Sequence, residues 1–128
     1  MKFTLILTLL ASLVTTGLLS LPAQAKNQGD ELVLEMHRAY ARNDAKRLSA
    51  LLPQVRGHVL EPLAAYWEMR ARLDTASDSQ IRSFLNTYAG SYYEDRLRND
   101  WLQQLGKRRQ WATFTAEYPL YRMRCLLY

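Results

Sequence analysis

The residues that could do chemistry are few and widely spaced along this 128-residue chain. His37 and His58 lie in different segments, and neither has a Cys, His or carboxylate at a metal-ligand spacing such as H-x-x-x-H. Glu94 and Asp95 are adjacent carboxylates, but neighbours on a helix point about 100° apart and cannot flank a glycosidic bond. The sequence also lacks G-x-S-x-G and a Gly-rich phosphate loop. We therefore expect no metal, no cofactor and no catalytic residue, with the two carboxylates solvated in a first helical turn.

A basic cluster is the first candidate for binding. Lys107, Arg108 and Arg109 are consecutive, and Arg96 and Arg98 lie just upstream. Such a cluster could attract an anionic partner, such as a cell-wall polymer or a membrane surface. The pattern favours a solvated helix junction over this binding role.

Several aromatic residues form the second candidate, because flat rings can stack on the apolar faces of sugars. Their helical spacing favours a place in the core over a place in a cleft. They are Tyr66, Trp67, Tyr92, Tyr93, Trp101 and Trp111.

The N-terminal segment has the pattern of a secretory signal peptide. Met1 and Lys2 precede an apolar stretch over 3–21, and Pro22-Ala23-Gln24-Ala25 provides an A-x-A cleavage site. An uncleaved membrane anchor is the competing interpretation, which the proline and the small residues disfavour. We expect residues 1–25 to be removed, leaving residues 26–128 as one small domain and lowering the formal net charge from +5 to +4.

Export predicts the compartment and limits the partners. We expect a monomer in the periplasm, without nucleic acid and without stable membrane insertion once the signal is cleaved. In an oxidising compartment the single cysteine, Cys125, is unusual: it is either a buried hydrophobe or has its partner outside this chain. It lies in an apolar run over 120–128 that has no helix stop signal, so the domain is expected to be truncated there.

Helix signals dominate the remainder, and strand signals are almost absent. Asp30 is expected to cap a helix to about Arg42, and Asn43-Asp44 to cap a second one over 45–52, closed by Pro53. Residues 54–60 should form a loop. Glu61-Pro62 then begins a third helix, with an exposed Glu68 and Arg72 pair and an inward stripe of Leu63, Tyr66, Trp67, Arg70 and Leu73.

Two capping boxes predict the next helices. Ser77-x-x-Gln80 opens one that Gly90 ends, with Ile81, Phe84, Leu85 and Tyr88 inward. Ser91-x-x-Glu94 opens another that Gly106 ends, with Tyr93, Leu97, Trp101 and Leu105 spaced by four. A sixth helix is expected over 107–118, with Trp111, Phe114 and Tyr118 on its apolar face and Pro119 after it, and a seventh should start near residue 120. The predicted fold class is all-α, an α-superhelix of stacked short helical hairpins.

Three segments resemble a known family. Residues 60–70, LEPLAAYWEMR, resemble the start of soluble lytic murein transglycosylases, where a leucine-rich helix pair precedes a Leu-x-Pro-Leu-x-x-Tyr-type motif. Residues 81–102 are similar to that family's Phe-Leu, Tyr-x-x-x-x-Leu-Arg and Trp-Leu helices, and Arg109-Gln110-Trp111 resembles its basic-x-Trp turn. The resemblance covers 30–128 in order, behind a signal peptide.

The resemblance implies an N-terminal U-shaped superhelix that carries a separate lysozyme-like catalytic domain. Such enzymes cleave the MurNAc–GlcNAc bond of peptidoglycan without water, using one glutamate in a Glu-Ser motif as acid and then base. No glutamate of this sequence is followed by serine, so that residue cannot be assigned, and peptidoglycan would bind through the missing domain. Cys125 resembles a family cysteine that pairs with one further down the superhelix. The alternative function is a free-standing periplasmic helical-repeat adaptor that binds a protein or peptide.

Overall fold

The structure is a computed structural model that describes the backbone of residues 21–123 and the side chains of residues 28–123. Within that range every regular element is helical and there is no strand, so the predicted all-α class is confirmed. The elements are α1 (Leu21–Ala41), α2 (Ala45–Leu51), the 3-10 helix η1 (Leu52–Val55), α3 (Glu61–Ala71), α4 (Asp78–Thr87), α5 (Tyr92–Lys107), α6 (Trp111–Glu117) and the 3-10 helix η2 (Tyr118–Leu120).

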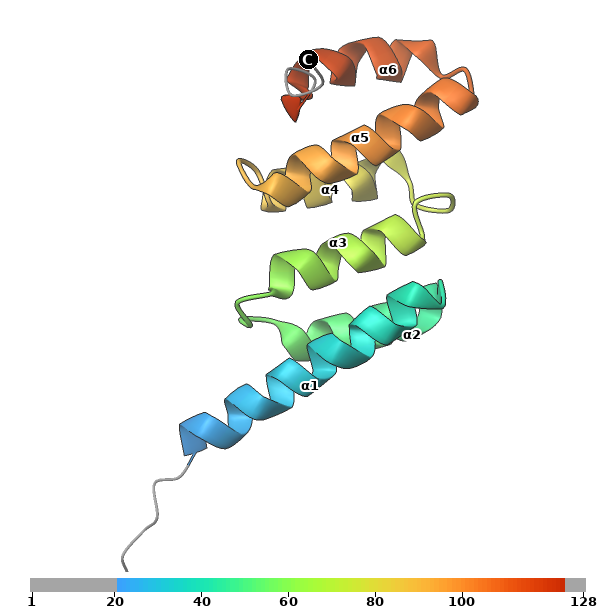
Figure 1. The fold of residues 1–128 in the computed structure, drawn as a ribbon. Coiled ribbons are helices and arrows are strands. Elements are labelled where there is room, and N and C mark those ends of the chain that lie inside the picture. Colours follow the sequence, from blue (N-terminus) through green and yellow to red (C-terminus); the bar gives the residue numbers. More distant parts are fainter. Residues whose placement is uncertain (1–20, 124–128) are drawn as a thin grey trace, which may run out of the picture.

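The helices stack along the molecule in sequence order (Figure 1). One row is formed by α1, α3 and α5, in which α3 contacts both α1 and α5. Behind this row, α2 packs against α1 and α3, and α4 packs against α5. At the C-terminal end α6 lies against α5. The row of alternate helices therefore presents one continuous surface.

Two hydrophobic cores meet at α3. Ala64 belongs to the first core and its neighbour Ala65 to the second, while Trp67 and Leu52 pack against both. The first core comprises Val33, Met36, Ala39, Leu48, Leu51, Val55 and Ala64. The second comprises Ala65, Tyr66, Met69, Leu73, Ile81, Phe84, Leu85, Leu97, Trp101, Leu102 and Leu105.

Because α3 lies between two cores, the single inward stripe that was predicted for it is wrong. Arg70, expected to point inward, is exposed, whereas Met69 is buried. Glu68, expected on the surface with Arg72, is also buried, where Ser49 Oγ donates to its carboxylate at 2.7 Å. A helix with neighbours on several sides buries more than one face, so a one-stripe pattern fails.

Side-chain caps explain where three helices begin. The Asp44 carboxylate accepts a hydrogen bond from Arg47 N at 3.0 Å, as predicted. The Ser77 and Gln80 capping box is present in both directions, which confirms that prediction as well. Ser91 accepts from Glu94 N at 3.2 Å, but the Glu94 carboxylate accepts from Gly90 N at 2.7 Å and not from Ser91 N, so the second box is only half formed.

Other predicted boundaries are wrong. Asp30 lies inside α1 instead of capping it. The second helix ends at Leu51, one residue before its predicted end, but Pro53 then lies in the first turn of η1, which takes up part of the predicted loop over 54–60. Gly106 lies within α5, and the chain leaves the helix through Arg109, which has a positive φ of 56°. The sixth helix begins at Trp111, later than expected.

The end of the described chain also differs from the expectation. After η2 the backbone is extended at Tyr121, so the described part of the chain, which ends at residue 123, contains no α-helix that starts at residue 120. Cys125 lies outside the described residues, as does most of the predicted signal peptide. In the part of the chain that the structure describes, no helix combines the length and the apolar character needed to cross a bilayer.

Candidate functional site

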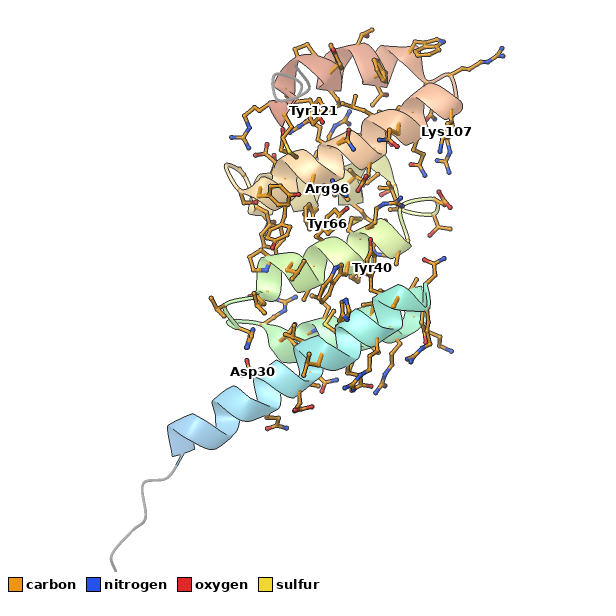
Figure 2. The ribbon with its side chains drawn as sticks, viewed as in Figure 1. Asp30, Tyr40, Tyr66, Arg96, Lys107 and Tyr121 are labelled. Carbon is orange, nitrogen blue, oxygen red and sulfur yellow. The ribbon has the colours of Figure 1, made fainter. Side chains whose placement is uncertain are left out.

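A polar network joins α3 to α5 on the row formed by alternate helices (Figure 2). Tyr66 Oη donates to Asp100 Oδ2 at 2.6 Å, and Arg70 Nε lies 3.2 Å from the same carboxylate oxygen. Arg96 Nε donates to Tyr66 Oη at 3.4 Å. Tyr66 and Arg70 are four residues apart on α3, as Arg96 and Asp100 are on α5, so each pair shares one helix face. The two faces meet where the helices pack.

The network carries an excess of positive charge. Its one carboxylate, Asp100, has a side chain only 10% exposed, whereas the Arg70 side chain is 46% exposed. Arg96 is exposed and forms no ion pair with a carboxylate of the described residues; its hydrogen-bond partner is a phenol. That hydrogen bond raises the pKa of the Arg96 guanidinium. Two guanidinium groups thus surround one neutralising carboxylate.

Tyr66 is a neutral hydrogen-bond donor in this network. Burial, followed by the hydrogen bond to Asp100, raises the pKa of its hydroxyl from 10.0 to about 12. Because the phenol keeps its proton at physiological pH, it cannot act there as a base or a nucleophile. Its role is to connect the two helices and to hold Arg96.

Aromatic side chains extend from this network in both directions along the row. The Tyr93 ring lies 6.0 Å from that of Tyr66, and Tyr92 contacts Tyr93 edge-on at 5.5 Å. On the other side of α3, Trp67 stacks with Tyr40 at 5.8 Å and contacts His37 at 5.4 Å. Such ring contacts stabilise the packing of α1 and α5 on α3.

The structure separates the six aromatic candidates for ring stacking into buried, partly buried and exposed side chains, and Trp67 and Tyr93 are partly buried against the second core. Trp101 is 1% exposed and Tyr66 is also buried, so neither can stack on a ligand. Tyr92 is 60% exposed and Trp111 is 55% exposed. These two lie on different elements, α5 and α6, and only Tyr92 adjoins the polar network.

The basic residues singled out in the sequence do not form one patch. Lys107, Arg108 and Arg109 are exposed at the turn between α5 and α6. Arg108 Nη2 donates to the Asp74 backbone carbonyl at 2.8 Å and so ties this turn to the loop after α3. Arg98, predicted to extend the cluster, is buried.

Arg98 lies at the centre of a buried ionic cluster that sequence reasoning missed. It pairs with Glu94 at 3.0 Å and with Glu117 of α6, and Glu117 also lies 3.3 Å from Arg82 of α4. Burial alone would raise the pKa of Glu94, but the Gly90 N–H and the neighbouring guanidinium groups of Arg98 and Arg122 lower it below its usual value. The cluster therefore joins three helices.

Asp95 is not solvated, contrary to the prediction for this first helical turn. It is buried and accepts hydrogen bonds from the backbone N–H groups of Arg122 at 2.8 Å and Met123 at 2.7 Å. Glu94 and Asp95 both hold Arg122: the Glu94 carboxylate pairs with its guanidinium at 3.1 Å, while Asp95 accepts from its backbone N–H.

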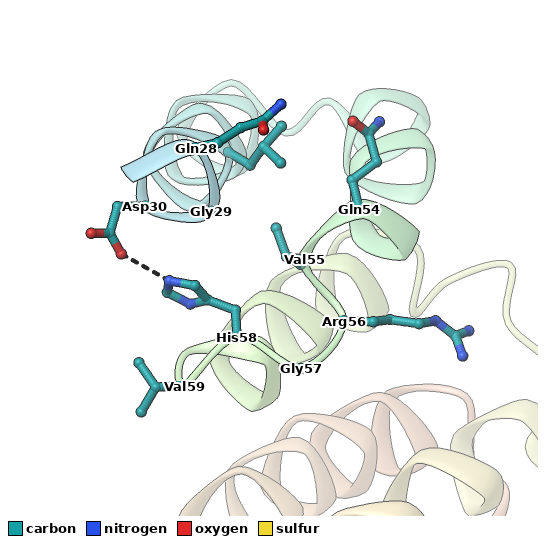
Figure 3. A pocket seen from close by; sticks show the side chains of 10 residues that line it. Gln28, Gly29, Asp30, Gln54, Val55, Arg56, Gly57, His58 and Val59 are labelled. Carbon is teal, nitrogen blue, oxygen red and sulfur yellow. Dashed lines mark hydrogen bonds and ion pairs between the residues drawn. The ribbon is translucent and has the colours of Figure 1, made fainter. Parts of the chain in front are cut away.

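His58 lines a cleft of about 550 Å³ between α1 and the loop before α3 (Figure 3). Its Nε2 lies 2.8 Å from Asp30 Oδ1, and Leu60 N donates to its Nδ1 at 3.1 Å. Since Nδ1 accepts, Nε2 carries the proton and donates to Asp30, so neither nitrogen is available as a base. A Cβ at Gly29 would lie 2.8 Å from the His58 ring, so any other residue there would force the imidazole to move.

The described residues contain no group of three or more His, Cys, Asp or Glu that could hold a metal ion. The network between α3 and α5 was not predicted. Its two four-residue spacings are visible in the sequence, but the sequence does not show that these two helices face each other.

No protein-family model, no curated protein and no solved structure matches this chain.

Proposed function

We propose that this chain is the N-terminal helical scaffold of a periplasmic peptidoglycan lytic transglycosylase, whose acid-base glutamate belongs to a separate domain. In this proposal the stacked helices form an α-superhelix, and residues 1–25 direct it to the periplasm. The function of the segment is to hold a catalytic domain against the cell wall, while the bond cleavage takes place on that domain.

The observation that carries the proposal is the ordered stacking of helices around α3. The segment that resembles the family, 60–70, supplies residues to both cores. Later segments of the resemblance supply Leu97, Trp101 and Leu102 to the second core. Residues that bind successive helices together are those expected of a repeat scaffold, in which each unit buries its apolar face against the next.

The buried glutamates of the described chain fit a structural role. Glu68 is paired with Arg72 and accepts from Ser49, and Glu117 is paired with Arg98 and Arg82. Each contributes to packing between elements. An acid-base glutamate instead needs a raised pKa and access to the substrate.

A direct test begins with the genomic sequence beyond the codon for Tyr128. An extension that encodes Glu-Ser followed by Gly-Leu-Met-Gln supports the proposal, and its absence favours the helical-repeat adaptor. In parallel, purified residues 26–128 are incubated with peptidoglycan sacculi. We expect no release of anhydro-muropeptides above a buffer control, and release would contradict the separation of scaffold and catalytic domain.

A further inference from the structure

The network between α3 and α5, in which Tyr66 is buried, adjoins exposed side chains on the same two helices. We call Tyr66, Arg70, Tyr92, Tyr93 and Arg96 the tyrosine–arginine surface. Its residues lie on adjacent helices of the row seen from the front in Figure 2, where Tyr66 and Arg96 are close together at its centre. Tyr92 and Arg96 are exposed and Arg70 is nearly half exposed, so a partner could reach them.

The chain supplies one carboxylate, Asp100, to the two guanidinium groups of this surface: it pairs with Arg70, and its charge also raises the pKa of Arg96. Asp100 faces both Arg70 and Tyr66 and is almost enclosed by them. The next carboxylates along α5, Glu94 and Asp95, are already engaged by guanidinium groups and backbone N–H groups. Arg96 is left with a phenol oxygen as its hydrogen-bond partner. Its guanidinium can still donate to an external carboxylate, with which it would form stronger, charge-assisted bonds.

The side chains of the surface are held in place before any partner binds. Tyr66 accepts from Arg96, and its ring contacts Tyr93, on which Tyr92 packs edge-on. Side chains that are already ordered lose less entropy on association. Tyrosine and arginine are also the residue types enriched among those that dominate the energetics of protein interfaces. The tyrosine–arginine surface therefore combines exposed side chains, positive charge and side chains that are already ordered.

We propose that the tyrosine–arginine surface is a docking site for an acidic segment of a protein partner. One carboxylate of the partner binds Arg96, and an aromatic or apolar side chain of the partner lies against the exposed Tyr92 ring. The proposal does not depend on the scaffold function above, because it rests on the charge and exposure of these residues alone.

The test is a nuclear magnetic resonance titration of the processed, purified protein with a blocked peptide of sequence Glu-Glu-Tyr-Glu-Glu. We expect saturable shifts of the Arg96 Nε–H and Tyr92 ring signals. The same peptide with glutamine in place of glutamate should produce none. Arg96→Gln and Tyr92→Ala should each weaken binding of the acidic peptide about tenfold, which corresponds to about 1.4 kcal/mol. Both side chains are exposed, so both variants should remain folded; Arg96→Gln loses the long hydrogen bond to Tyr66, whose hydroxyl keeps its bond to Asp100.

Arg109→Gln is the matched control, because Arg109 is also exposed but lies at the turn after α5. Its affinity for the peptide should equal that of the parent. Equal binding of the glutamine peptide, unchanged affinity in Arg96→Gln, or no saturable shift with the acidic peptide would each overturn the proposal. If a soluble peptidoglycan fragment shifts these signals and the acidic peptide does not, the surface binds glycan and the protein-partner proposal is wrong.

Discussion

Tyr66 combines packing and polar bonding in one side chain. Its ring belongs to the second core, while its hydroxyl donates to Asp100 and accepts from Arg96. The hydrogen bonds satisfy the one polar atom of a side chain that is otherwise buried. An unsatisfied buried hydroxyl would cost free energy of the same order as the bond itself.

The Tyr66→Phe variant tests this arrangement. We expect the free energy of unfolding to fall by about 1 kcal/mol at neutral pH, since the hydrogen bond to Asp100 is lost while the ring is kept. The measurement is urea denaturation, with Tyr92→Phe as the control because Tyr92 is exposed and forms no comparable bond. Equal loss in both variants would contradict a special role for the Tyr66 hydroxyl.

The same variant should change the response to alkaline pH. The pKa of Tyr66 is about 12 in the folded protein against 10.0 ordinarily, so the folded chain keeps a proton that the unfolded chain releases. This contribution to stability is complete below pH 10 and is lost as the pH rises toward 12. The parent should therefore lose more stability than Tyr66→Phe between neutral pH and about pH 11.

Arg109 is strained at the backbone, because a positive φ brings its Cβ close to the following carbonyl. Arg109→Gly should raise the free energy of unfolding by about 0.5–1 kcal/mol, as glycine adopts this conformation without the clash. Asn43 has the same φ of 56° and is the matched comparison. Since asparagine tolerates this region better than arginine, Asn43→Gly should have the smaller effect in thermal denaturation.

At the scale of the element, α5 contacts three other helices, α3, α4 and α6. Its apolar residues Leu97, Trp101 and Leu105 point into the second core, as their spacing of four predicts. Its other faces carry Asp100 toward α3 and Arg98 toward α6. One helix therefore carries core packing and two polar contacts on separate faces.

Trp101→Ala is the prediction for this element. Removal of a fully buried indole from between Leu97 and Leu105 should cost about 3–5 kcal/mol. Trp111→Ala is the control, since that ring is 55% exposed on α6 and its loss should cost much less. Melting temperatures of both variants provide the comparison, and an unchanged value for Trp101→Ala would contradict its burial.

At the scale of the whole molecule, the ends of the stack are held differently. At the α1–α2 end, residues of α1, α2, η1 and α3 form the first apolar core. In α6, by contrast, the buried residue is the charged Glu117, while Trp111 is exposed. Of the predicted apolar face of that helix, Phe114 is partly buried and packs against the second core, whereas Trp111 and Tyr118 are exposed.

Glu117→Ala should therefore loosen one end of the stack before the rest. Removing one partner of a buried ionic cluster leaves Arg98 without part of its neutralising charge, which is costly. We expect faster amide hydrogen exchange in α6, with exchange in α1 and α3 unchanged. Uniformly faster exchange throughout the chain would indicate a single cooperative unit, contrary to this expectation.

The sequence by itself determined the helical class, most helix starts and the inward residues of α4 and α5. These depend on local interactions: Asp44, Ser77 and Ser91 cap the helices that follow them in the chain, and apolar spacing is a property of one helix. It did not determine which helices face each other. That information lies in contacts between distant residues, such as Tyr66 with Asp100 or Arg98 with Glu117.

Only the tertiary structure therefore decided which charged residues are buried and which are exposed. Glu68, Asp95 and Arg98 are buried with partners from other segments: Ser49 for Glu68, the Met123 backbone N–H for Asp95 and Glu117 for Arg98. The sequence does not reveal these distant partners. It also decided that Arg96 is exposed while Arg98, two residues later, is enclosed, because two residues along a helix point in nearly opposite directions. The candidate binding surface results from that difference.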